Sequence, residues 1–148
     1  MHELLARVVE AHGGLARWKR HETLSATIVT GGALWALKGL VQDVNPRTVS
    51  VRMHTEYASV TPFVKPGWRT AFTPERVAIE TLQGEVVQER RDARKSFDGH
   101  TMNMPWDPLH RAYFNGYALR LYLTTPFFMA MPGFELTEIE PWKEGGET

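Results

Sequence analysis

The segment that decides the fold is Arg47-Thr48-Val49-Ser50-Val51-Arg52-Met53-His54-Thr55-Glu56-Tyr57, in which apolar and polar side chains alternate. In an extended chain Val49, Val51 and Met53 point to one side, and the polar residues between them point to the other. This alternation is typical of an antiparallel sheet with one dry face and one solvated face. The segment therefore predicts a half-buried strand.

Similar period-two patterns lie on both sides of this segment. Between the predicted strands at 23–28 and 33–41, Gly31-Gly32 is interpreted as a hairpin turn or as a bulge within one long bent strand. We expect about six or seven antiparallel strands in sequential order before Asp92, and one more strand after Pro132-Gly133. The further strands are predicted at 23–28, 33–41, 57–63, 68–73, 76–82, 85–91 and 134–140.

Two parts of the chain show helical spacing instead. Apolar residues from Leu4 to Leu15 predict an N-terminal helix that Gly13-Gly14 ends or kinks. A second helix is predicted to begin at Trp106-Asp107-Pro108, because Asp107 caps free amides and Pro108 suits the first helical position. Its apolar stripe comprises Leu109, Ala112, Tyr113, Gly116, Tyr117 and Leu121.

The end of this second helix is predicted at Thr124-Thr125-Pro126, and the following residues 127–131 are apolar all round, so we expect them to be buried. Gly116 inside the helix indicates close packing on a strand, or a ligand that passes over bare backbone. Together these patterns predict an α+β fold. An N-terminal helix is followed by a curved antiparallel sheet, an incomplete barrel, which wraps the central helical segment.

Length and composition limit the classes of function. The chain has 148 residues, equal numbers of basic and acidic side chains, and no cysteine. Residues 1–148 are expected to form one domain, and the turn-like Glu144-Gly145-Gly146-Glu147 suggests the N-terminal part of a longer half-barrel. Zero net charge disfavours nucleic acid as a partner, and no apolar tract is long enough to span a membrane. With no signal peptide or lipobox visible, we expect a cytoplasmic protein.

A family resemblance rests on three segments: Ala11-His12-Gly13-Gly14-Leu15-Ala16-Arg17-Trp18, Trp106-Asp107-Pro108-Leu109-His110 with residues 113–118, and residues 122–127. The chain resembles bacterial proteins similar to the lipoprotein-localisation-factor superfamily. The resemblance implies an incomplete barrel that holds helices in its concave, apolar side and carries acyl chains or lipoproteins.

The candidate ligand-binding residues are apolar and aromatic side chains from the predicted sheet and helix. Such side chains adapt to irregular acyl groups, and a few hydroxyls orient a polar head. Complete filling of the core by the same residues is the competing interpretation. The sheet would contribute Val49, Val51, Met53, Trp68 and Phe72, and the helix Tyr113, Tyr117, Tyr122 and Phe128.

The candidate catalytic pair is His110 with Asp107, for which a local hydrogen bond at the helix start is the simpler explanation. No histidine spacing indicates a metal site, and no motif indicates a cofactor. Arg90-Arg91 with Arg94-Lys95 is interpreted as a solvated rim, since Arg90 and Arg91 face opposite sides of a strand.

These observations favour a non-catalytic protein that binds a hydrophobic, lipid-like small molecule or acyl chain in the concave face of a half-barrel. One alternative is a homo-oligomeric interaction module, a homodimer formed through an edge strand. Another is an enzyme of unknown type that uses His110 and Asp107.

Overall fold

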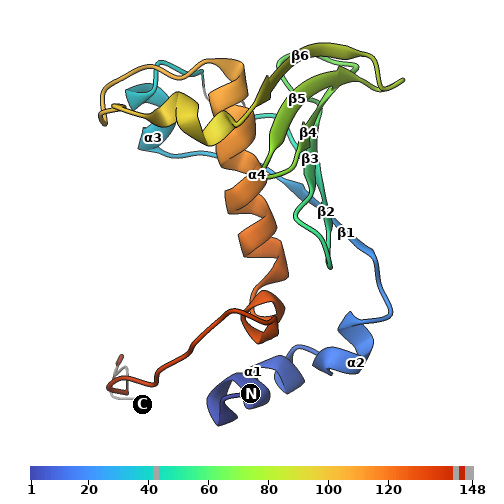
Figure 1. Cartoon of the computed structure of the whole chain (residues 1–148), viewed down its shortest axis with the longest axis vertical. Helices are drawn as coiled ribbons and strands as arrows, with labels where there is room; N and C mark the ends of the chain where they lie inside the picture. The colour runs from blue at the N-terminus through green and yellow to red at the C-terminus, as the bar shows by residue number, and fades with distance from the viewer. Residues whose placement is uncertain (42–43, 142–143, 146–148) are drawn as a thin grey trace.

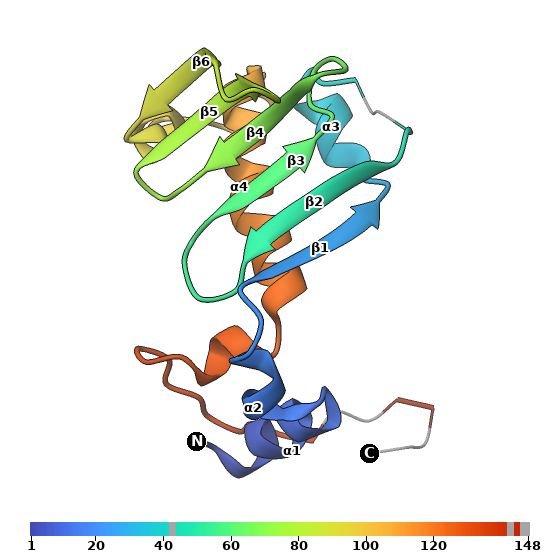
Figure 2. The same cartoon turned by 90° about the vertical axis from the view of Figure 1, so that its right-hand side faces the viewer.

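The computed structural model describes residues 1–41, 44–141 and 144–145. Six strands form one open, curved antiparallel sheet, in which each strand lies beside its neighbours in the sequence (Figure 1, Figure 2). The predicted α+β class with an open antiparallel sheet is confirmed. The strands are β1 (Thr23–Ile28), β2 (Arg47–Arg52), β3 (Ala58–Thr61), β4 (Trp68–Phe72), β5 (Arg76–Thr81) and β6 (Val86–Arg91).

Strand β2 has the two-faced character that its sequence predicts. Val49 pairs with Val60 and Val51 pairs with Ala58 on β3. Both β2 valines are fully buried. On the opposite face, Ser25 of β1 donates a hydrogen bond to the Ser50 hydroxyl over 3.2 Å. The sheet thus has a dry face and a polar face.

The helices are α1 (Glu3–Ala11), α2 (Gly14–Trp18), α3 (Ala33–Leu37) and α4 (Pro108–Thr124), with short 3-10 helices η1 (Ala93–Phe97) and η2 (Phe127–Ala130). The predicted break after the first helix is confirmed: Gly13 has a φ of 98°, which favours glycine. Below the sheet, the Trp18 ring of α2 stacks on Phe127 of η2, with centroids 4.4 Å apart.

Helix α4 lies across the dry face of the sheet (Figure 1). The Asp107 side chain accepts a hydrogen bond from the backbone N–H of His110, and Pro108 is the first helical residue, as predicted. A Cβ atom on Gly116 would lie 2.1 Å from Cγ of Phe72, which is fully buried on β4. The absence of a side chain at Gly116 therefore lets α4 approach the sheet closely, as one of the two interpretations predicts.

The predicted hairpin or bulge at Gly31-Gly32 and the predicted strand over 33–41 are wrong. The chain instead forms α3 from Ala33 to Leu37, with Gly32 as its N-cap residue. The five residues of α3 are all apolar and carry no clear period, so the pattern does not separate strand from helix. Alanine and leucine favour a helix, and α3 buries Trp35 to 6% exposure.

The predicted strand over 134–140 is also wrong, because none of these residues belongs to a strand in the described part of the chain. The segment instead runs past α1, where Nε2 of His2 lies 3.7 Å from a carboxylate oxygen of Glu138. Residues 127–131 are half-buried rather than buried. The predicted turn at 144–147 lies partly outside the described residues. Among the described strands, the edges of the sheet are β1 and β6.

Candidate functional site

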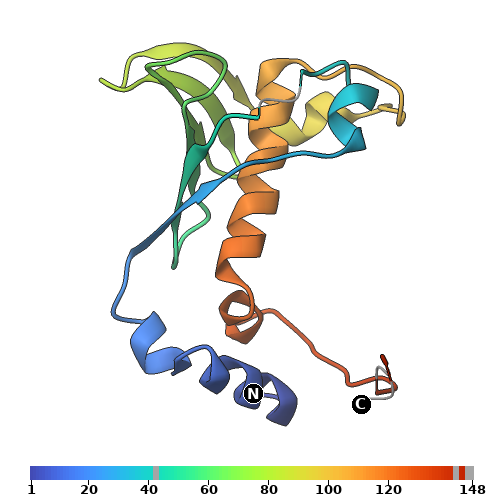
Figure 3. The same cartoon turned by 180° about the vertical axis from the view of Figure 1, so that it is seen from behind.

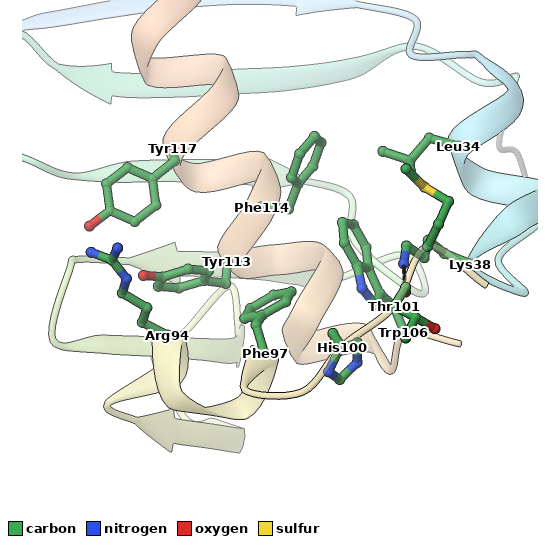
Figure 4. A pocket seen from close by; sticks show the side chains of 11 residues that line it. Leu34, Lys38, Arg94, Phe97, His100, Thr101, Trp106, Tyr113, Phe114 and Tyr117 are labelled. Carbon is green, nitrogen blue, oxygen red and sulfur yellow. Dashed lines mark hydrogen bonds between the residues drawn. The ribbon is translucent and has the colours of Figure 1, made fainter. Parts of the chain in front are cut away.

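Helix α3 and the 3-10 helix η1 lie beside α4 on the side that faces away from the sheet (Figure 3). Residues of these elements and of α4 line a groove of about 670 Å³. We term it the α4 groove. Its volume is in the range of small-molecule sites, and its walls are mostly apolar and aromatic. The lining residues are Leu34, Lys38, Arg94, Phe97, His100, Thr101, Met102, Trp106, Tyr113, Phe114 and Tyr117 (Figure 4).

Lys38 connects α3 to the 98–106 loop, which closes one end of the groove. Its Nζ donates a hydrogen bond to the Thr101 carbonyl over 2.9 Å and lies 5.1 Å from the Trp106 ring centroid. The Lys38 carbonyl in turn accepts a hydrogen bond from the Trp106 backbone N–H. With only 5% of its surface exposed, Lys38 acts as a cross-link between α3 and the 98–106 loop.

Ring contacts hold the floor of the groove in place. Phe97 of η1 lies 5.6 Å from Trp106 and 5.5 Å from Tyr113, measured between ring centroids. Phe114 lies 5.2 Å from the Trp106 ring. Aromatic pairs at such separations contribute about 0.5–1.5 kcal/mol each beyond area burial. These contacts therefore stabilise the aromatic floor of the groove.

The opposite end of the groove is polar. Figure 4 shows the Arg94 guanidinium on the same side of the groove as the hydroxyls of Tyr113 and Tyr117. Burial raises the pKa of Tyr117 to about 12, helped by a hydrogen bond with Tyr113 and by the Glu56 charge, while Arg94 opposes the shift. Tyr117 is therefore a neutral hydrogen-bond donor at physiological pH.

The His110–Asp107 pair lies at the start of α4 and is engaged in the helix cap. Nδ1 of His110 lies 3.2 Å from the Asp107 backbone nitrogen, and Nε2 lies 3.2 Å from the Ser96 carbonyl oxygen. Asp107 also forms an ion pair of 2.6 Å with Arg90. Partial burial disfavours the Asp107 carboxylate, but hydrogen bonds from Arg90 and the His110 backbone outweigh it and lower its pKa.

The predicted ligand-binding residues lie in different parts of the structure. Val49, Val51 and Phe72 are buried in the sheet, where Trp68 is partly buried, and Met53 is buried just beyond the end of β2. Tyr113 and Tyr117 line the α4 groove. Tyr122 is 69% exposed and outside this groove, and Phe128 packs on Phe134 with centroids 5.1 Å apart. Of the nine, the structure thus brings two helix tyrosines into the groove.

Sequence reasoning missed most of the groove lining, including Leu34, Phe97, Met102, Trp106 and Phe114. The sequence predicts a strand over 33–41, which includes Leu34, and predicts no helix or strand over 92–104. One signal was available: Phe114 follows Tyr113 directly, so α4 carries aromatic side chains on more than one face. A helix that is apolar on two faces needs a second partner besides the sheet.

The described residues contain no group of three or more His, Cys, Asp or Glu side chains placed to hold a metal ion. No helix within the described ranges has the length and apolar character of a membrane span. Comparison of the chain with protein-family models, curated proteins and solved structures finds no match. The resemblance to the lipoprotein-localisation-factor superfamily therefore stays a prediction.

Proposed function

We propose that the chain is a non-catalytic binding protein that holds a hydrophobic, lipid-like ligand in the α4 groove. The observation that carries this proposal is the groove itself: about 670 Å³ of space whose lining is dominated by aromatic and aliphatic side chains. Transfer of an apolar chain from water to such a surface is favourable by about 25 cal/mol per Å² of apolar area buried. Shape and desolvation therefore supply the binding free energy.

This proposal places the ligand differently from the sequence-based hypothesis. Between sheet and helix, Val49, Val51 and Phe72 are fully buried by protein, and the Phe72 ring fills the space that a side chain on residue 116 would need. On the other side of α4, Tyr117 remains 42% exposed and Met102 63% exposed. The unfilled apolar surface thus favours the outer side of the helix as the ligand site.

The test is native mass spectrometry of the full chain purified from cells, with Met102→Trp as a variant that fills the groove. Met104→Trp is the matched control, because Met104 is in the same loop and 44% exposed but outside the groove lining. We expect co-purified acyl species on the wild type and on Met104→Trp, and their loss from Met102→Trp. Equal ligand loading of both variants would contradict the proposal.

The engagement of His110 supports a non-catalytic function over an enzyme that uses this residue. Both of its ring nitrogens lie within hydrogen-bonding distance of protein groups, and its exposure is 9%. We expect His110→Ala to lower the free energy of unfolding by about 1–2 kcal/mol, because it leaves buried partners without hydrogen bonds. An unchanged stability in urea titrations would remove this argument and favour the enzyme alternative.

A homodimer through an edge strand is the second candidate, and one observation favours it. On edge strand β6, Val86 and Val87 are 52% and 38% exposed. An edge strand with exposed apolar side chains favours pairing with a strand of another chain. Sedimentation equilibrium at micromolar concentration tests this candidate. A dimer that Val87→Lys dissociates would support it, and a monomer would exclude it at that concentration.

A further inference from the structure

The basic residues that line the α4 groove select one kind of ligand head. They are Lys38 at one end, Arg94 at the polar end, and His100; the lining contains no carboxylate, although the Glu56 charge acts on Tyr117 from outside it. An apolar groove with positive charge at its end complements a molecule with an apolar body and an anionic head.

Arg94 differs from its basic neighbours in having no carboxylate partner among the described residues. Arg90 pairs with Asp107 at 2.6 Å, and Lys95 pairs with Asp92 at 3.4 Å. Arg91 lies 4.0 Å from Glu89. Within residues 90–95, the basic side chains outside the groove thus each lie close to a carboxylate. Arg94, which lines the groove, has no such partner among the described residues.

Two hydroxyl groups close to Arg94 can take part in the same site. Figure 4 shows its guanidinium beside the hydroxyls of Tyr113 and Tyr117. A guanidinium offers a planar fork of N–H donors that matches a carboxylate, and a neutral phenol adds an O–H donor. Lys38, by contrast, already donates to the Thr101 carbonyl and is 5% exposed.

We propose that Arg94, with Tyr113 and Tyr117, forms a carboxylate site for the head of an amphiphilic ligand whose apolar body lies along Phe97 and Phe114. This inference rests on the proposed function and adds the chemical class of the ligand. The ligand is a monocarboxylate of the fatty-acid type, oriented with its charged head at the Arg94 end.

The test compares decanoate with decanol on the full chain by isothermal titration calorimetry near pH 7.5. The two probes share the apolar body and differ in the head. In the wild type we expect decanoate to bind about tenfold more tightly than decanol, as a charge-assisted hydrogen bond at a partly exposed site allows. Arg94→Gln is expected to abolish this preference and to leave decanol affinity within about twofold.

Lys95→Gln is the matched control, because it removes the same charge from the same short helix at a residue outside the groove lining. It should keep the preference for decanoate. Tyr117→Phe removes one donor and should weaken decanoate about fivefold. A preference that persists in Arg94→Gln, or that Lys95→Gln removes equally, would overturn the carboxylate site.

The two proposals fail differently in this experiment. Equal binding of decanol and decanoate by the wild type would overturn the carboxylate site and leave the hydrophobic groove in place. Binding of neither probe would contradict the proposed function itself. Preference for decanoate that depends on Arg94 but not on Lys95 supports both.

Discussion

Helix α4 has two apolar faces that differ in how their neighbours meet them. On the sheet face, Ala112 and the opposing Phe72 are fully buried, and Gly116 lets the helix approach the Phe72 ring. On the groove face, Phe114 is half-buried and Tyr117 is 42% exposed. Residue type alone therefore does not separate the core side chains of α4 from those that line the groove. Where the neighbouring element fills the space beside α4, the helix side chains form part of the core. Where it leaves space, they line a groove.

The largest effect is expected at the centre of the sheet face. Phe72→Ala removes a ring that is fully buried and contacts Tyr113 and Tyr117 at centroid distances of 5.6 and 4.8 Å. We expect a loss of about 3–5 kcal/mol in the free energy of unfolding, measured by urea denaturation. A loss below about 1 kcal/mol would mean that the sheet face is not closely packed.

The second prediction concerns Gly116, where the new methyl group would meet the Phe72 ring. Gly116→Ala should destabilise by about 1–3 kcal/mol despite the better helix propensity of alanine. In a Phe72→Ala background the same change should be neutral or stabilising, because the methyl group enters vacated space. A double-mutant cycle measures this coupling. Additive effects of the two substitutions would contradict direct packing between these residues.

The third prediction tests the anchor that fixes the start of α4 against β6. Asp107→Ala removes both the cap and the ion pair with Arg90, and should cost about 1–2 kcal/mol near pH 7. Asp107→Asn, which keeps a capping side chain, should cost less.

The anchor also predicts a pH dependence. The folded-state pKa of Asp107 is lowered, so its stabilisation is present above the ordinary carboxyl pKa and is lost as the pH falls through the lowered value. The difference in the free energy of unfolding between wild type and Asp107→Asn should therefore become smaller below about pH 4. Urea titrations across this range check the sign, and a difference that grows on acidification would contradict it.

The smallest effect on stability is expected on the groove face. Met102→Ala removes a side chain that is 63% exposed and lines the α4 groove. The free energy of unfolding should change by less than about 0.5 kcal/mol, while decanol affinity falls through lost apolar contact. Calorimetry and urea titration on the same preparation separate the two quantities. A large stability loss with unchanged affinity would reverse the assignment of the two faces.

The sequence predicts the sheet and α4 well because local signals decide them. The alternation around Val49 and Val51 and the Asp107-Pro108 start of α4 are of this kind. It fails at α3, whose apolar run has no period, and at 134–140, a largely exposed segment that runs past the N-terminal helix without pairing with a strand. Phe97 and Leu34 enter the groove because tertiary contacts place two short helices beside α4. No local sequence pattern predicts the position of these two helices beside α4.

The claim that the ligand lies on the outer face of α4 is tested most directly by methyl NMR spectra of the full chain during a decanol titration. The account predicts shifts at the groove methyl groups of Leu34 and Met102. The methyl groups of Val49, Val51 and the fully buried Val77 of β5 should be unchanged. Shifts at these three valines without shifts at Leu34 and Met102 would place the ligand between helix and sheet and contradict the account.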